Sequence, residues 1–309
     1  MRVYCKSGQE KLINYLLFVN HMEKLWVKRK EDSDTAESDI LRLRRWYFPM
    51  SLPLINISDD RSVAEVSIVS KDVPGVMALV SSILASKNIN IMSGLITSAG
   101  QPGKSVLTLF IDYTGTGQTI ESIRNTLLSL KVIEDVNINT PIYEGLLIEQ
   151  FGFPLLLAGR RYVLMSLECF NMMIKRMQSI LGTSGLVLFY EMGKYAGEKR
   201  ARHLKEVFDL HGWQLVMVAL SEVQPTGWGI AELTVINEEE REWRVTVKDL
   251  FECTPFRDSS KECRSHFFRG YLEGVFKEAY ELEKSSCIEE KCVASGSEAC
   301  EFVITGVKS

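Results

Sequence analysis

The hydrophobic pattern between residues 63 and 140 is the feature that most limits what this chain can fold into. Apolar residues follow strand spacing in "VAEVSIV", helical spacing after "KDVPGV", and strand spacing again in "NINIMSGLIT" and "SVLTLFIDY", with a Gly/Pro turn between the last two. A second helical stretch, "QTIESIRNTLLSL", and a last strand, "VIEDVNINT", complete the series. The order βαββαβ predicts a ferredoxin-like domain, a four-stranded antiparallel sheet with two helices on one face.

The start of the first helix carries two local signals. Pro74 is expected at the first helical position, where its missing N–H costs nothing. Asp72 lies just before it, and its side-chain oxygen is expected to cap free backbone amides.

Residues 1–60 are expected to form a leader outside the two folded domains. The segment is mildly basic and contains the charge run "VKRKEDSDTAESD", while "MSLPLINI", beginning at Met50, is typical of a protein start. We therefore expect residues 1–49 to lie outside the working protein. Residues 9–27 have helical apolar spacing, so a membrane-surface or partner-binding helix is the alternative interpretation.

Composition and charge exclude several classes of function. No apolar run approaches the ~20 residues that a membrane-spanning helix needs. The formal net charge of −4 gives no general attraction to nucleic acid or anionic lipid. "LINYLLFVN" lacks the small-residue cleavage site of a secretory signal. We therefore expect a cytoplasmic protein with no membrane span and no direct nucleic-acid module.

Residues 142–309 predict a second domain of the α+β class, in which helices frame a small antiparallel sheet. A long helix over 159–182 ends at a glycine, a second helix covers 184–197, and "RARHLKEVFDLHG" supplies a third. "GWGIAELTVIN" and "EWRVTVKDLFEC" are expected strands, and "FFRGYLEGVFKEAYELE" is the last helix.

Cysteines gather near the C-terminal end of the chain, where five of the seven lie. Without an export signal, clustered thiols favour metal binding over disulfides. The stretch "EEKCVASGSEACEF" adds a carboxylate, and thiolate and carboxylate are both competent zinc ligands. Gly296 permits a turn that brings Cys300 back to Cys292. A redox pair is the second interpretation, although the stretch has no Cys-x-x-Cys, and an inert pair of buried cysteines is the third.

Two sets of motifs resemble known families. The βαββαβ order with "D-x-P-G-V" and "N-I-N-I" resembles the ACT domain, a small regulatory module that often binds amino acids, over residues 61–141. In ACT domains the loop after the first strand and the start of the second strand line an effector site, usually at a dimer interface. Carried over by position, this resemblance implies ligand binding by Asp72, Gly75, Asn88 and Asn90. A glycine and free helix N-terminal amides suit close approach by a carboxylate ligand, and dimerisation without a ligand is the alternative.

The combination of "GRRYVLMS", "GWGIAEL", "FFRGYLEG" and "EEKCVASGSEACEFVI" resembles the 4-vinyl reductase domain. This domain is named after a protein of the bacteriochlorophyll pathway. It also forms the sensor region of phenol-responsive transcription activators and shares its fold with small subunits of the TRAPP tethering complex. In the aromatic sensors its C-terminal segment holds a structural zinc beside a closed apolar pocket.

That second resemblance implies a structural zinc (Zn) in this chain. The upstream cysteine is the least certain match to the family pattern, so Cys253 and His266 stay open as alternatives to the assigned residue. The implied metal ligands are Cys263, Glu289, Cys292 and Cys300.

Catalysis finds little support in the sequence, which lacks Gly-x-Ser-x-Gly, His-Glu-x-x-His, a Walker loop and a post-strand Gly-x-Gly-x-x-Gly. We therefore expect a non-enzymatic regulatory or sensor protein. It is expected to form a homodimer that binds an apolar or aromatic ligand in the C-terminal domain and an amino acid at the ACT-like domain. The alternative is an enzyme or enzyme subunit of tetrapyrrole (vinyl reductase) metabolism, and a tethering scaffold with a buried acyl chain is a third hypothesis.

Overall fold

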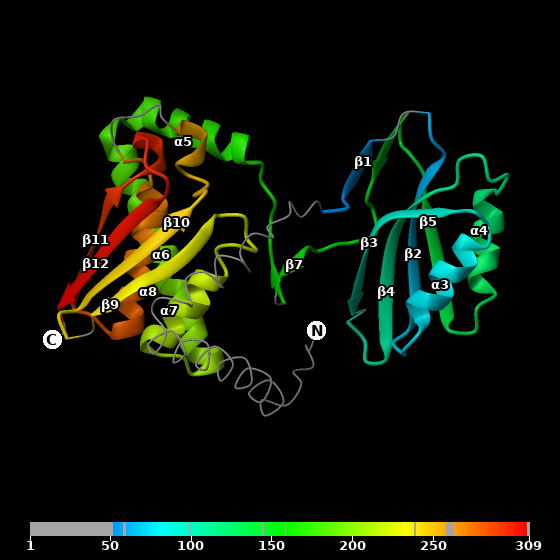
Figure 1. The fold of residues 1–309 in the computed structure, drawn as a ribbon, viewed down its shortest axis with the longest axis horizontal. Helices are drawn as coiled ribbons and strands as arrows, with labels where there is room; N and C mark the ends of the chain where they lie inside the picture. Colours follow the sequence, from blue (N-terminus) through cyan, green and yellow to red (C-terminus); the bar gives the residue numbers. More distant parts are fainter. Residues whose placement is uncertain are drawn as a thin grey trace, which may run out of the picture. The chain divides into compact units, whose positions relative to one another are not determined.

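The structure is a computed structural model of the 309-residue chain. It has two compact units, one within residues 40–163 and one within residues 164–309 (Figure 1). The amphipathic helix expected at residues 9–27 lies outside the described residues. The structure describes residues 52–57, 60–98, 100–143, 145–157, 159–237, 239–257 and 263–307.

The first unit contains the predicted βαββαβ domain. Its sheet has the strand order β3-β4-β2-β5, every pairing is antiparallel, and both helices cover one face (Figure 1). Alternate strand residues such as Val66 and Leu109 point toward the helices and are buried against Val80 and Ile123. The elements are β2 (Val63–Lys71), α3 (Val76–Ala85), β3 (Asn90–Ser98), β4 (Lys104–Asp112), α4 (Ile120–Leu128) and β5 (Ile133–Asn139).

The start of α3 differs from the sequence prediction. Gly75 is the N-cap residue, in a left-handed conformation with φ of 91°, so Pro74 lies outside the helix. No side chain makes a capping hydrogen bond at this end of α3, so the prediction that Asp72 caps it is wrong. The turn is made instead by the glycine, whose missing Cβ permits positive φ.

The second face of this sheet is partly covered by a strand pair. β1 (Ile55–Ile57) and β6 (Leu146–Ile148) are antiparallel partners, and Leu147 of β6 is fully buried against Val63 and Phe110. The unit therefore begins before the predicted boundary at residue 61 and extends past the one at 141. Further along the chain, β7 (Leu156–Leu157) pairs with β8 (Arg160–Arg161).

The second unit has the predicted α+β architecture. An antiparallel sheet of order β11-β12-β10-β9 packs against α8, and α6 lies along α8 (Figure 1). Trp243, Phe276 and Phe302 are among the fully buried side chains of its core. Its elements are α5 (Leu167–Leu181), α6 (Thr183–Phe208), α7 (Gly212–Ser221), β9 (Ile230–Asn237), β10 (Glu242–Lys248), η1 (Thr254–Phe256), α8 (His266–Tyr280), β11 (Lys284–Lys291), η2 (Val293–Ser295) and β12 (Cys300–Val307).

Several boundaries in this unit differ from prediction. The two helices expected around 184–197 and in "RARHLKEVFDLHG" are one continuous helix, α6. The long helix before it starts only after Ser166, whose side chain accepts a hydrogen bond from the Cys169 amide. α7 and β11 lie where we predicted no element. No helix among the described residues combines the length and the apolar character that crossing a membrane requires.

Four glycines explain why α6 can lie so close to α8. A Cβ built on Gly193 or Gly197 of α6 would lie 2.0 Å or 2.1 Å from a backbone carbonyl oxygen of α8. A Cβ on Gly270 or Gly274 of α8 would lie 2.1 Å from a carbonyl oxygen of α6. Each helix thus presents two glycines four residues apart on one face, and only glycine fits there.

Candidate metal centre

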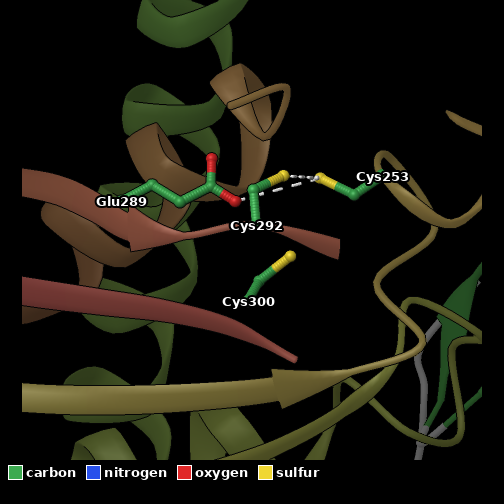
Figure 2. A group of neighbouring side chains, drawn as sticks. All are labelled: Cys253, Glu289, Cys292 and Cys300. Atoms are coloured by element: carbon green, nitrogen blue, oxygen red, sulfur yellow. Dashed lines mark hydrogen bonds between the residues drawn. The ribbon is translucent and has the colours of Figure 1, made fainter. Parts of the chain in front are cut away.

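Four potential metal ligands meet at one end of the second unit. They are Cys253, Glu289, Cys292 and Cys300 (Figure 2). All four are buried, and one ligand atom from each lies within 4.8 Å of the others. The group is the one cluster of this kind found among the described residues.

Three separate segments bring these side chains together. Cys253 lies in the turn between β10 and η1, and Glu289 points inward from β11. Cys292 follows the end of β11, and Cys300 begins β12. Gly296, with φ of 97°, makes the turn between the last two, as the sequence predicted.

The spacing of the donor atoms fits a tetrahedral zinc ion. The Sγ atoms of Cys253 and Cys292 are 3.5 Å apart, and Cys253 Sγ is 4.0 Å from Glu289 Oε1. Zinc–sulfur bonds of ~2.3 Å in a tetrahedron place two sulfurs about 3.8 Å apart. Three thiols and one carboxylate are also a competent donor set for a closed structural site.

The close contact of the thiols makes them unequal in acidity. The hydrogen-bond contact between the Cys253 and Cys292 thiols lowers the pKa of Cys292 and raises the pKa of Cys253. Cys292 is therefore the thiol that ionises most easily. Burial raises the pKa of Glu289 to about 7, while a hydrogen bond from Ser265 opposes this shift.

Two polar residues that sequence reasoning missed support the group. Ser265 donates to Glu289 Oε2 through its hydroxyl and, at 3.3 Å, through its amide. The buried carboxylate of Glu252 accepts from the amides of Phe267 and Phe268 at 2.9 Å and 3.0 Å, so it caps α8 beside the cluster. Burial raises the pKa of Glu252 to about 8. A serine directly before a helix is a typical N-cap signal, but the Ser265 side chain makes no capping hydrogen bond and binds Glu289 instead.

The structure places Cys253, rather than the predicted Cys263, in the group of four. Cys263 lies beside it, with its Sγ 3.6 Å from the backbone oxygen of Glu289, and it is only partly buried. His266 is the first residue of α8 and is also outside the group. The group of four therefore contains Cys253, which the sequence had left as an alternative, in place of the assigned Cys263. The physical reason is that residue spacing does not determine which of the preceding cysteines approaches the β11–β12 hairpin.

Aromatic rings form a second notable group in this unit. Their ring centroids lie 5.1 Å apart for Phe170 and Phe251, and 5.2 Å apart for both Phe189–Phe267 and Trp228–Tyr271. They come from α5, α6, α8 and the loops that flank β9 and β10. We call these six residues the aromatic cluster.

The four predicted effector residues of the first unit do not form one site within a chain. Asp72 and Gly75 follow the end of β2, where Lys71 pairs with Lys104 at the start of β4. Asn88 precedes β3, and Asn90 pairs with Asp112 at the opposite end of β4. The Asp72–Gly75 pair and the Asn88–Asn90 pair are therefore separated by the length of that strand.

Comparison with sequence families decides what the first unit is. Residues 66–134 match the family model described as "AHAS small subunit-like ACT domain". Residues 66–134 form an ACT-like domain. No curated protein matches the chain significantly.

Solved structures similar to parts of the chain include both families that the sequence motifs resemble. The phenol-responsive sensory domain of the transcription activator PoxR, solved with phenol, is 17% identical, with 54% of this chain and 84% of that chain covered and a TM-score of 0.43. A vinyl-4-reductase family protein from Methanocaldococcus jannaschii is 18% identical, with 46% and 92% covered and a TM-score of 0.29. The ACT domain of the GTP pyrophosphokinase of Chlorobium tepidum is 16% identical, with 26% and 99% covered and a TM-score of 0.22.

Proposed function

We propose that this chain is a non-catalytic regulatory protein that senses small molecules. The observation that carries the proposal is the ACT-like domain at residues 66–134. The six cysteines of the described residues are free thiols, which fits a reducing, cytoplasmic setting.

An amino acid is the proposed ligand of the ACT-like domain, bound between two copies of the chain. Strand β3 is an edge of its sheet, and it exposes Leu95 and Ile96. If two copies join these edges antiparallel about a two-fold axis, the start of β3 in one copy lies beside the end of β3 in the other. That arrangement would bring Asp72 and Gly75 of one copy near Asn88 and Asn90 of its partner.

A second apolar surface supports homodimerisation. On α5 and the first half of α6, large apolar side chains are exposed at helical spacing, whereas such faces are normally covered. These residues are Met172, Met173, Ile180, Val187, Leu188 and Met192.

The second unit is proposed to bind an apolar or aromatic molecule next to the aromatic cluster. Aromatic faces and edges suit flat apolar ligands, and a zinc ion on the adjacent residues Cys253, Glu289, Cys292 and Cys300 would fix the surrounding chain. The zinc is proposed to be structural, because four protein ligands leave no open position for chemistry.

Native mass spectrometry of the purified protein tests this function. We expect a species of twice the 35.1 kDa chain mass, with one zinc per chain and a retained small molecule. A single-chain species at micromolar concentration, without a retained ligand, would count against both the dimer and the sensor. Turnover of a divinyl tetrapyrrole with NAD(P)H would instead favour the enzyme hypothesis.

Gly75→Val tests the ACT-like site. Because Gly75 has φ of 91°, a β-branched residue would shift the turn that precedes α3, although a Cβ there would meet no atom within 4 Å. We expect the variant to lose the thermal stabilisation that the wild-type protein shows with its amino-acid ligand. The measurement is a thermal shift assay with each common amino acid in turn.

Gly115→Val is the matched control for this assay. Gly115 also has positive φ, at 70°, and open space around its Cβ position, but it lies in the turn after β4. The control should therefore share the backbone strain and keep the amino-acid response. A response that persists in Gly75→Val, or that is lost equally in both variants, would remove this loop as the ligand site.

A further inference from the structure

A buried carboxyl group lies under the strand pair that covers the sheet of the first unit. Glu65 is on β2, on the face opposite the helices, and its side chain is 0% exposed. Its neighbours in register are Phe110 on β4 and Asn139 on β5. A carboxyl group in such a place must be hydrogen-bonded, neutral, or both.

The contacts of Glu65 attach the chain that follows β6 to the sheet. Oε2 accepts hydrogen bonds from Asn139 Nδ2 at 3.0 Å and from the backbone amide of Gln150 at 3.2 Å. Asn139 Nδ2 also donates to the backbone oxygen of Ile148 at 2.7 Å. Residues 149–152, here called the latch segment, are thereby held through Glu65.

A second carboxyl group, that of Glu149, lies close to Glu65. Oε1 is buried and has no hydrogen-bond partner among the described residues, while the Glu149 side chain lies close enough to Glu65 to raise its pKa. Two carboxyl groups share a hydrogen bond only when one of them carries a proton. Glu149 is itself fixed by the amides of Phe151, at 2.8 Å, and Gly152, which both donate to its Oε1.

No positive charge among the described residues offsets this pair. Burial, the largest cause, and the charge of Glu149 raise the pKa of Glu65 to about 7, while the bonds from Asn139 and Gln150 oppose the shift. Asp112, on the same face, is engaged with the Thr114 amide and with Arg61. Ionisation of Glu65 therefore leaves two negative charges in contact under the latch segment.

We propose that Glu65 and Glu149 form a proton-operated latch, closed over the sheet when one proton is shared between the two carboxyls and opened when that proton leaves to solvent. The latch segment continues along the chain toward the second unit. Opening the latch would therefore release the start of this connecting segment from the sheet. The proton is held more tightly in the closed form than in the open one. The stabilisation of the closed form by this proton is therefore fully present below the ordinary carboxyl pKa. It is lost as the pH rises through about 7.

Hydrogen exchange of the peptide covering residues 146–152, corrected for the intrinsic effect of pH, tests the proposal on the full-length protein. With a pKa of 4.5 for Glu65 in the open form and about 7 in the closed form, opening should increase about tenfold between pH 6 and pH 8. Glu65→Gln should keep the low-pH protection at both pH values. Its carbonyl oxygen can accept the bonds from Asn139 and Gln150, while its NH₂ group donates to Glu149.

Glu121→Gln, which removes an exposed carboxylate on α4, is the control and should retain the wild-type pH response. A wild-type exchange rate independent of pH would overturn the latch. So would a Glu65→Gln variant with an unchanged pH response. Calcium that restores wild-type protection at pH 8 would show that a cation, rather than a proton, joins the carboxyls, and would also overturn it.

Discussion

Replacing Gly197 by alanine is expected to destabilise the second unit by about 3 kcal/mol. The new Cβ would lie 2.1 Å from the backbone oxygen of Tyr271, and neither helix backbone can yield without separating α6 from α8. Alanine would otherwise favour an exposed helix by about 1 kcal/mol relative to glycine, so the sign of the change itself distinguishes packing from propensity. Thermal unfolding should show a loss of about 10 °C in the transition of the second unit.

Gly185→Ala is the control for this substitution. Gly185 lies on the same helix and is buried, but a Cβ there would only approach Met177 and Leu181 at 3.3 Å. These neighbours include flexible side chains, so we expect a change below about 1 kcal/mol. Equal losses in both variants would mean that the α6–α8 contact is not as close as described.

Cys292→Ser is expected to remove zinc and to destabilise the second unit by on the order of 5 kcal/mol. The serine hydroxyl is a poor zinc ligand, and a site with three remaining ligands leaves buried polar groups unsatisfied. The ACT-like domain should keep its own unfolding transition, because it has a separate core. The measurements are elemental analysis and two-domain melting with and without a chelator.

Cys287→Ser separates metal binding from packing. Cys287 is also a buried thiol of the β11 strand, but it is not among the four clustered ligands. This control should keep one zinc per chain, and Glu289→Gln should lose less stability than Cys292→Ser because its shape is retained. If a chelator shifts neither unfolding transition, the four residues are buried packing residues and not metal ligands. A zinc content well below one per chain in the wild-type protein would lead to the same conclusion.

The first unit was predictable because its information is local. Strand and helix periods in residues 63–140 follow directly from alternation across a sheet and from the helical stripe. The burial of Glu65 could not be predicted in this way, because the chain that covers it, around β6, lies some eighty residues later in the sequence. The contact between Glu65 and residues 149–152 could therefore be found only from the three-dimensional structure.

The second unit was less predictable because its structure depends on contacts between residues that are far apart in the sequence. The glycines of α6 look like helix breakers by propensity, yet they are where another helix comes closest. "KSSCIEEK" has little strand character and becomes β11 only by pairing with β12. For the metal site, Glu289, Cys292 and Cys300 share one hairpin and could be grouped from spacing, whereas Cys253 arrives from a distant turn.

The strand pair β1–β6 has a practical consequence for the choice of domain boundaries when fragments of this chain are prepared. The family match spans residues 66–134, but β1 and β6 lie outside it on both sides. An excised fragment with those limits would expose Phe110, which is fully buried in the intact unit, and would lack Val63 and Leu147. An aromatic ring uncovered on an open sheet face promotes self-association. We therefore expect a fragment of residues 52–152, which includes β1 and β6, to keep both faces of the sheet covered as in the intact unit.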